Sequence, residues 1–301
     1  SAALWLNFAT SVGAPVSTTH SIVGGVMGGG IAAAGFSIVN WDTMTEIVSS
    51  WVISPVLGAV VAAGFLYFIK KQIIYKEDKI TAAIKFVPIL IAIMTWSFGT
   101  YIILKGLKEL IKLDFYTAGS IALVLAVVSF FWSKKLILKA ALKLENNRTS
   151  VNSLFTIPLI FSAALLSFAH GANDVANAIG PLAAINDAIL NSEISSKASI
   201  PFWVMAVGAF GIVVGLILYG PKLIKTVGSE ITELDQIRAF SIALAAAFTV
   251  IIASQLGLPV SSTHIAVGGV FGVGFLREFL DATESRFAQE IRKRFKKDKK
   301  E

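Results

Sequence analysis

Residues 11–30 read SVGAPVSTTHSIVGGVMGGG, and residues 255–274 read QLGLPVSSTHIAVGGVFGVG. The two stretches align without gaps, and 12 of their 20 positions are identical. Identity at this level within one chain indicates an internal duplication. We therefore expect a fold built from two related units, with the rest of the chain arranged around them.

The sequence around the repeats has the composition of a membrane protein. It is 55% hydrophobic and 15% charged over 301 residues, with a mean hydropathy of +0.75, which leaves too little polar surface to cover a water-soluble globule. Apolar runs of about 17 to 24 residues predict helices that cross a bilayer. The predicted spans are 21–39, 47–69, 86–104, 116–133, 153–186, 201–219, 239–256 and 265–276, of which 153–186 is too long for one simple crossing.

The basic residues predict how these helices are oriented. All 26 Lys and Arg lie outside the predicted spans. Following the chain alternately across the membrane places 22 of them on one face and 4 on the other, and the positive-inside rule assigns the larger group to the cytoplasm. The basic tail is then cytoplasmic, in a multi-pass protein of the cell membrane. The net charge of +7 follows from topology and predicts no nucleic-acid partner.

This topology gives the two repeats opposite directions, because the first leads the chain to the outer face and the second returns it to the inner face. Secondary transporters are commonly built from such inverted duplications, with the binding site at the repeat interface near the midplane. We predict an all-α polytopic membrane protein with inverted-topology repeats, in which two helical hairpins and discontinuous helices meet near the midplane.

The repeat also divides the chain. Residues 1–133 are expected to hold the remainder of the first repeat plus connecting helices, 134–150 a cytoplasmic loop, 151–280 the second inverted repeat and 281–301 a basic cytoplasmic segment. The second repeat contains the segment GAND from Gly171, 88 residues before Pro259, and the equivalent position for the first repeat lies before Ser1. We therefore expect a longer protein, with roughly 90 further residues upstream and one further helix downstream.

Each repeat places a proline and a cluster of hydroxyl side chains between two apolar runs, as PVSTTH at 15–20 and PVSSTH at 259–264. Proline breaks a helix, and Ser or Thr caps the helix that follows. The expected hairpin tips present hydroxyls and free backbone N–H groups at the positive end of a helix, which binds an anion without a basic side chain. A proline kink with back-bonded hydroxyls is the alternative. We interpret the glycine runs at 24–30 and 268–274 as close helix packing with no ligand role.

Asp174 is the one residue among 45 charged residues that lies deep inside an apolar run. Asn173 and Asn177 add amide oxygens beside it, on a stretch where we expect Gly171 to break the helix. One carboxylate with neutral oxygens suits sodium better than Ca²⁺ or Zn²⁺. The alternative is a structural Asp that caps a helix.

The three histidines, His20, His170 and His264, all lie in these motifs. We expect His20 and His264 to fix the tips by hydrogen bonds. A metal site or a proton relay is the alternative.

A charge argument favours a coupled mechanism. With no Lys or Arg in any span, a dianion must be neutralised by helix N-termini, hydroxyl donors and co-bound cations. Cation-coupled symport with alternating access follows. An intramembrane hydrolase using Ser261, His264 and Asp174 is a second hypothesis, although the chain contains no G-x-S-x-G elbow. An anion channel that needs no cation is a third.

GANDVANAIGP at 171–181, together with the two PVS[ST]TH motifs, closely resembles the inorganic phosphate transporter (PiT) family. The resemblance covers nearly the whole chain and implies import of inorganic phosphate by sodium-coupled symport. It implies phosphate binding at the two tips and sodium binding at the GAND segment. The implied phosphate ligands are Ser17, Thr18, Thr19, Ser261, Ser262 and Thr263, and the implied sodium ligands are Asn173, Asp174 and Asn177.

The resemblance leaves some properties open. Members of this family carry phosphate with sodium or with protons, and some prefer sulfate. The expected partners are phosphate, co-transported sodium and the lipid bilayer, without an organic cofactor. We leave the oligomeric state open, with a homodimer as one option.

Overall fold

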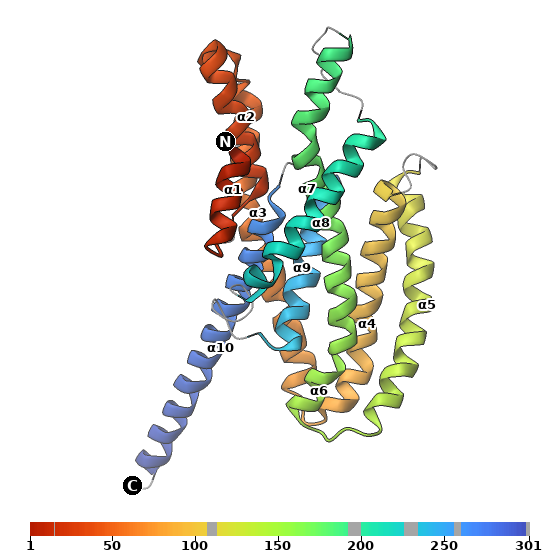
Figure 1. The fold of residues 1–301 in the computed structure, drawn as a ribbon. Coiled ribbons are helices and arrows are strands. Elements are labelled where there is room, and N and C mark those ends of the chain that lie inside the picture. The colour runs from red at the N-terminus through yellow and green to blue at the C-terminus, as the bar shows by residue number, and fades with distance from the viewer. Residues whose placement is uncertain (15, 107–112, 192–199, 226–233, 256–259, 299–301) are drawn as a thin grey trace.

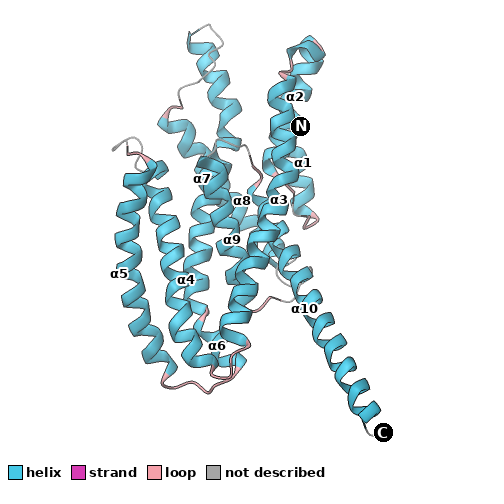
Figure 2. Ribbon diagram, turned by 180° about the vertical axis from the view of Figure 1, so that it is seen from behind, coloured by secondary structure: helices cyan, strands magenta, loops and turns pink. Residues whose placement is uncertain are grey.

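The computed structural model describes residues 1–14, 16–106, 113–191, 200–225, 234–255 and 260–298 (Figure 1). Within these ranges it does not describe the side chains of residues 105, 106, 172, 173, 191, 223, 254, 255 and 283–298. The described chain is helical and contains no strand (Figure 2). The predicted all-α class is confirmed.

The helices follow the predicted apolar runs closely. In chain order, those of the described ranges are α1 (Ala2–Ser11), α2 (Thr18–Ala34), α3 (Trp41–Ile69), α4 (Lys79–Tyr101), α5 (Phe115–Ala141), α6 (Arg148–Leu154), α7 (Thr156–Asn191), α8 (Phe202–Lys225), α9 (Gln236–Gln255) and α10 (Ser262–Asp298). A 3-10 turn at Phe36–Ile38 follows α2, and π turns at Lys70–Ile74 and Ile102–Gly106 extend α3 and α4.

Six helices of the described residues are long and apolar enough to cross a membrane. They are Trp41–Ile74, Lys79–Leu104, Phe115–Ala141, Thr156–Leu190, Phe202–Lys222 and Gln236–Ala253. Large apolar side chains remain exposed along α5, among them Val124, Val128, Phe131 and Trp132. An exposed apolar face of this kind is costly in water and normal against lipid tails. A multi-pass membrane protein is the consistent interpretation.

Two boundaries differ from the sequence prediction for local reasons. The span predicted at 21–39 ends as a helix at Ala34, because Gly35 adopts a φ of 76° and terminates α2. The loop predicted at 134–150 is much shorter, since α5 continues to Ala141 and α6 begins at Arg148. Lysines near the end of α5 are compatible with a helix, because the C-terminal dipole favours cations.

The expectation of a helix broken at Gly171 is wrong. The backbone of α7 is continuous from Thr156 to Asn191, and Pro181 lies inside it. A glycine costs about 1 kcal/mol in a helix interior but keeps its N–H donor, so packing can hold the helix together. Helices end instead at the two tips. The first tip lies between α1 and α2, and the second lies between α9 and α10.

Residues of three segments predicted to be cytoplasmic, 70–85, 134–150 and 220–238, contact one another toward the lower end in Figure 1. Asn146 accepts a hydrogen bond from the Lys79 amide at 2.8 Å and donates one to the Glu77 carbonyl at 2.8 Å. Arg148 pairs with Asp235 at 3.0 Å. These contacts bring parts of the three segments together, and their assignment to the cytoplasmic face stays a prediction.

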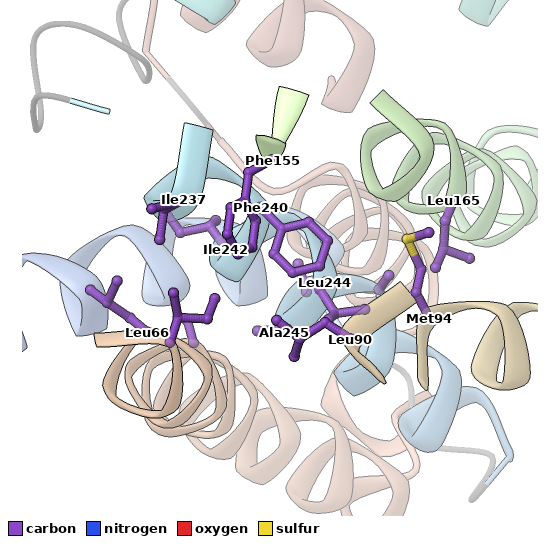
Figure 3. Close-up of a cluster of buried hydrophobic side chains, with 14 of the residues drawn as sticks. Leu66, Leu90, Met94, Phe155, Leu165, Ile237, Phe240, Ile242, Leu244 and Ala245 are labelled. Atoms are coloured by element: carbon purple, nitrogen blue, oxygen red, sulfur yellow. The ribbon is translucent and has the colours of Figure 1, made fainter. Parts of the chain in front are cut away.

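The buried core surrounds α9 (Figure 3). Phe240 and Leu244 of α9 are fully buried, and they belong to the same cluster as Leu66 of α3, Leu90 of α4 and Leu165 of α7. The Phe155 ring meets Phe240 edge-on at 5.4 Å between centroids. This packing fixes α9, and with it the base of the second hairpin, against three membrane helices.

The two hairpins point toward each other from opposite ends. In Figure 1, α2 runs from its tip to the upper end, whereas α10 runs from its tip to the lower end beside α3. Close backbone contacts hold α10 against α3, because Gly268 faces Pro55 and Gly272 faces Ala59. The tips consequently meet in the interior of the molecule.

Candidate functional site

The two tips share one local geometry. Ser17 precedes α2 in an extended conformation, and its hydroxyl accepts a hydrogen bond from the His20 amide at 3.2 Å. Ser261 accepts from the His264 amide at the same distance, 3.2 Å. Both serines are buried. Each tip therefore begins a helix with a serine N-cap, as the two PVS motifs predicted.

Asp174 of α7 joins the tips. Its Oδ2 accepts a hydrogen bond from the Thr18 hydroxyl at 3.2 Å, and its Oδ1 accepts one from the Ser262 hydroxyl at 3.3 Å. The side chain of Asp174 is only 12% exposed. One buried carboxylate thus contacts a residue of each repeat.

Two neighbours on α7 complete this arrangement. His170 lies one turn before Asp174, with its Nε2 at 2.7 Å from Oδ2. Asn177 lies on the other side, and its amide nitrogen donates to the Thr19 hydroxyl at 2.8 Å. A carboxylate, an amide and three hydroxyls, those of Thr18, Thr19 and Ser262, provide the oxygen ligands that a hard cation prefers.

Ring contacts connect the tips a second time. The His20 and His264 rings meet edge-on at 4.3 Å between centroids, and His20 also contacts the Trp51 ring at 3.7 Å. His20 Nε2 and Trp51 Nε1 are buried without a hydrogen-bond partner in the described part of the chain. The imidazoles thus pack on each other, and it is the backbone N–H groups of His20 and His264 that fix the tips.

Most of the predicted site residues come together here. Ser17, Thr18, Thr19, Ser261, Ser262, Asp174 and Asn177 form one group around the tips. Thr263 follows Ser262 in the first turn of α10 and is half-buried. The side chain of Asn173 lies outside the described residues.

The hydrolase geometry is not assembled. Asp174 pairs with His170, and the His264 ring faces His20. The Ser261 hydroxyl accepts from a backbone amide instead of donating to an imidazole. A triad needs the serine, histidine and aspartate in one hydrogen-bonded chain.

Sequence reasoning missed a contact between α8 and the first hairpin. Lys222 donates to the Ser11 carbonyl, and the Tyr219 hydroxyl donates to the Asn7 side chain at 2.9 Å. A lysine that follows the predicted span 201–219 therefore reaches the end of α1. Hydropathy alone carries no signal for such a contact.

Known proteins resemble this chain in sequence and in fold. The sequence pattern described as the Phosphate transporter family matches residues 1–296. The chain belongs to the phosphate transporter family. This confirms the resemblance drawn from the GAND and PVS motifs.

Relatives of this phosphate transporter family member come from bacteria and archaea. A predicted phosphate permease of Helicobacter pylori (strain ATCC 700392 / 26695) is 60% identical over 293 residues, and the match covers 96% of this chain and 55% of the relative. A predicted phosphate permease of Thermococcus kodakarensis is 40% identical over 278 residues, covering 92% of this chain and 67% of the relative. The chain therefore spans about half the length of the Helicobacter relative.

A solved structure also matches this family member. It is described as the sodium-dependent phosphate transporter and superposes with a TM-score of 0.84 at 36% sequence identity. The match covers 92% of this chain and 68% of that one. The family and this structural neighbour are transporters and not enzymes.

Proposed function

We propose that the intact protein imports inorganic phosphate by sodium-coupled symport with alternating access. In this proposal the two hairpin tips bind phosphate, and Asp174 with Asn177 and Asn173 binds sodium. The observation that carries the proposal is the position of Asp174, which accepts a hydrogen bond from both tips at once. A cation bound there would be held by residues that also line the anion site.

The charges around the tips support coupling. The ion pairs of Arg148 and Arg238 with Asp235 lie at the far end of α9 from the second tip. The tips themselves carry hydroxyls and the N-termini of α2 and α10, and Lys222 reaches the Ser11 carbonyl where α1 leads into the first tip. The nearest acid, Asp174, would repel phosphate. A sodium ion at Asp174 neutralises the carboxylate and so removes that repulsion. Binding of either ion therefore favours binding of the other.

Two further parts of the proposal follow from the fold. The opposite directions of the hairpins support inverted-topology repeats, in which each hairpin gates one face. The clustering of basic segments at the lower end in Figure 1 supports a cytoplasmic position for that end and for the tail.

The test is uptake of labelled phosphate into vesicles that contain the full-length protein, under imposed sodium or proton gradients and with sulfate as competitor. A sodium gradient is expected to drive accumulation, and sulfate is expected to compete weakly. Accumulation that ignores sodium and follows only the phosphate gradient would indicate a channel.

Asp174→Asn tests the assigned ligand. Loss of one charge at about 4 Å from a bound cation removes about 4 kcal/mol at an effective dielectric constant of 20, enough to abolish coupled uptake. Asp187→Asn, on the same helix and more than three turns away, is the matched control and is expected to transport normally. Sodium-dependent uptake that survives in Asp174→Asn would remove this residue from the site.

Proton coupling is a second candidate, favoured by one observation. His170 Nε2 lies 2.7 Å from Asp174, so a proton on the imidazole could take the place of a bound cation. The same vesicles discriminate the two candidates, because a proton gradient without sodium then drives uptake in the wild type and not in His170→Gln.

A further inference from the structure

The internal duplication pairs each residue of the first hairpin, formed by α1 and α2, with a residue of the second hairpin, formed by α9 and α10. Residue 11 aligns with residue 255, so the shift between the copies is 244 residues. The same shift places α1 on the second half of α9 and α2 on the start of α10. If the two units share a fold, each face of the first hairpin should have the same kind of neighbour as its counterpart.

The glycines of the two hairpins differ in what surrounds them. Gly268 and Gly272 of α10 lie so close to the α3 backbone that neither leaves room for a methyl group. Their counterparts in α2 are Gly24 and Gly28, and a methyl group at either would meet no atom of another described element within 4 Å. Small residues let membrane helices approach closely. The α2 helix therefore carries the glycines of a close contact without a neighbouring helix among the described residues.

Apolar side chains of the first hairpin show the same difference. Val26 of α2 is 58% exposed, whereas its counterpart Val270 in α10 is 2% exposed. Trp5 of α1 is 53% exposed, whereas its counterpart Thr249 in α9 is 5% exposed and lines the space between α9 and α3. The first hairpin lies at the edge of the molecule in both views (Figures 1 and 2). It thus leaves open the faces that α3 covers in the second hairpin.

A counterpart of α3 would cover both open faces at once, because α3 packs against both α9 and α10. In the first unit α3 follows α2 along the chain, so in the second unit its counterpart follows α10. Residues 281–301 contain eight Lys and Arg and cannot form this apolar helix. The match to the Helicobacter relative covers 55% of that protein, which leaves ample length for a further helix.

We propose that the exposed face of the first hairpin is the docking surface for an apolar helix that follows residue 301 in the full-length protein. This surface comprises Leu4, Trp5, Gly24, Val26 and Gly28. The helix packs on α2 as α3 packs on α10. A lipid tail or a second copy of the chain would give no reason for the glycines of α2 to repeat the spacing of those that contact α3.

The docked helix would hold the first tip in position. Thr18 begins α2, and its hydroxyl donates to Asp174 at 3.2 Å. The described contacts of α2 with other helices are with α1 and α7, whereas α10 also has the long contact with α3. A helix on the open face would give the first hairpin the same support that the second hairpin already has.

The first test is thermal unfolding of the full-length protein in detergent. Gly28→Ala is expected to lower the unfolding temperature by several degrees, because the methyl group would meet the backbone of the docked helix. Gly29→Ala is the matched control, since its counterpart is Val273, a position that already accepts a side chain. On an uncovered helix both alanines would gain helix propensity and raise the unfolding temperature equally.

The second test identifies the occupant directly. The photoreactive residue p-benzoyl-phenylalanine replaces Val26 in the full-length protein, and the cross-linked peptide is identified by mass spectrometry. We expect a peptide from beyond residue 301, in a product that migrates as a monomer. The same residue at Val124, which is exposed on α5, is the control and is expected to form no adduct with that peptide.

The other outcomes would overturn the proposal. Equal unfolding temperatures for Gly28→Ala and Gly29→Ala, or adducts with lipid or detergent alone at Val26, would show that no helix covers this face. A cross-linked dimer would assign the face to a second copy, and a peptide from before Ser1 would assign it to an upstream segment. Neither test measures transport, so these outcomes are independent of sodium-coupled symport.

Discussion

Gly268→Ala tests whether glycine contacts between α3 and α10 hold the second hairpin in position. A methyl group at residue 268 would overlap the Pro55 carbonyl oxygen and lie 2.8 Å from the Pro55 Cα. Bringing the Pro55 Cα alone to an ordinary separation of 3.4 Å requires the two backbones to part by about 0.6 Å, and the closer carbonyl oxygen requires a larger movement. Backbone atoms have no rotamer to change, so the helices themselves must move.

The expected magnitude follows from overpacking, which costs typically about 1–3 kcal/mol. Alanine recovers about 1 kcal/mol of helix propensity, so the net loss of stability is smaller than the packing term. Gly274→Ala, on the same helix, provides the matched control because nothing lies within 4 Å of its added methyl group. Helix propensity cancels between the two variants, and their difference of about 1–3 kcal/mol isolates the packing.

Thermal unfolding of the purified full-length protein in detergent measures this difference. Each kcal/mol corresponds to about 2–4 °C in a domain of 150–250 residues, so Gly268→Ala should unfold several degrees below Gly274→Ala. Phosphate uptake should fall in Gly268→Ala alone, because the displaced α10 carries Ser262 away from Asp174. Equal unfolding temperatures for the two variants would refute the inferred contact.

Three further outcomes are expected. Ser17→Ala removes the N-cap of α2 and should lower the free energy of unfolding by about 1 kcal/mol. It should also raise the phosphate concentration for half-maximal uptake, and an unchanged value would mean that the hydroxyl has only a structural role. Arg148→Ala and Asp235→Ala, combined in a double-mutant cycle, should couple by less than about 1 kcal/mol, since Arg148 is 54% exposed, and the coupling should shrink in high salt. Hydrogen bonds from the side chain and backbone of Thr81 lower the pKa of Asp78, so its contribution to stability is present above the ordinary carboxyl range and is lost as pH falls through the lowered pKa. Asp78→Asn keeps a capping side chain, so its stability should fall less than that of the wild type in a denaturation series from pH 6 to pH 3. An equal fall in both proteins would contradict the assignment.

The site could be foreseen from the sequence because its signals are local. A duplicated Pro-Val-Ser motif predicts a capped hairpin tip wherever it occurs, and a single carboxylate in an apolar run must find polar partners. Those two constraints predicted a capped tip at Ser17 and at Ser261 and polar contacts for Asp174. The expectation that all three lie in one place came from the inverted repeat and the family resemblance. The distribution of Lys and Arg predicted opposite directions for the two hairpins, and the side of the membrane that each one faces stays a prediction.

Other features depend on packing that one-dimensional patterns do not encode. The continuity of α7 through Gly171 is decided by the helices around it, since propensity only disfavours glycine by about 1 kcal/mol. The stack of His20 on Trp51 and the contact of Lys222 with Ser11 join residues that are distant in sequence and share no periodicity. The unsatisfied hydroxyls of Ser54 and Thr249 also required coordinates, because both residues resemble ordinary helical hydroxyls until the described part of the chain shows no partner for them.

Each oxygen of the Asp174 carboxylate contacts a different repeat, and this arrangement affects whether ions can leak across the membrane. Oδ2 faces Thr18 of the first hairpin, and Oδ1 faces Ser262 of the second. If one hairpin moves away, the hydroxyl of the other still donates a hydrogen bond to one oxygen of the carboxylate. If both withdrew together, a buried negative charge would lose both hydroxyl donors, which makes the doubly open conformation the least stable of the set. In the proposed alternating-access cycle, this shared side chain would help to keep the membrane sealed while each hairpin in turn moves.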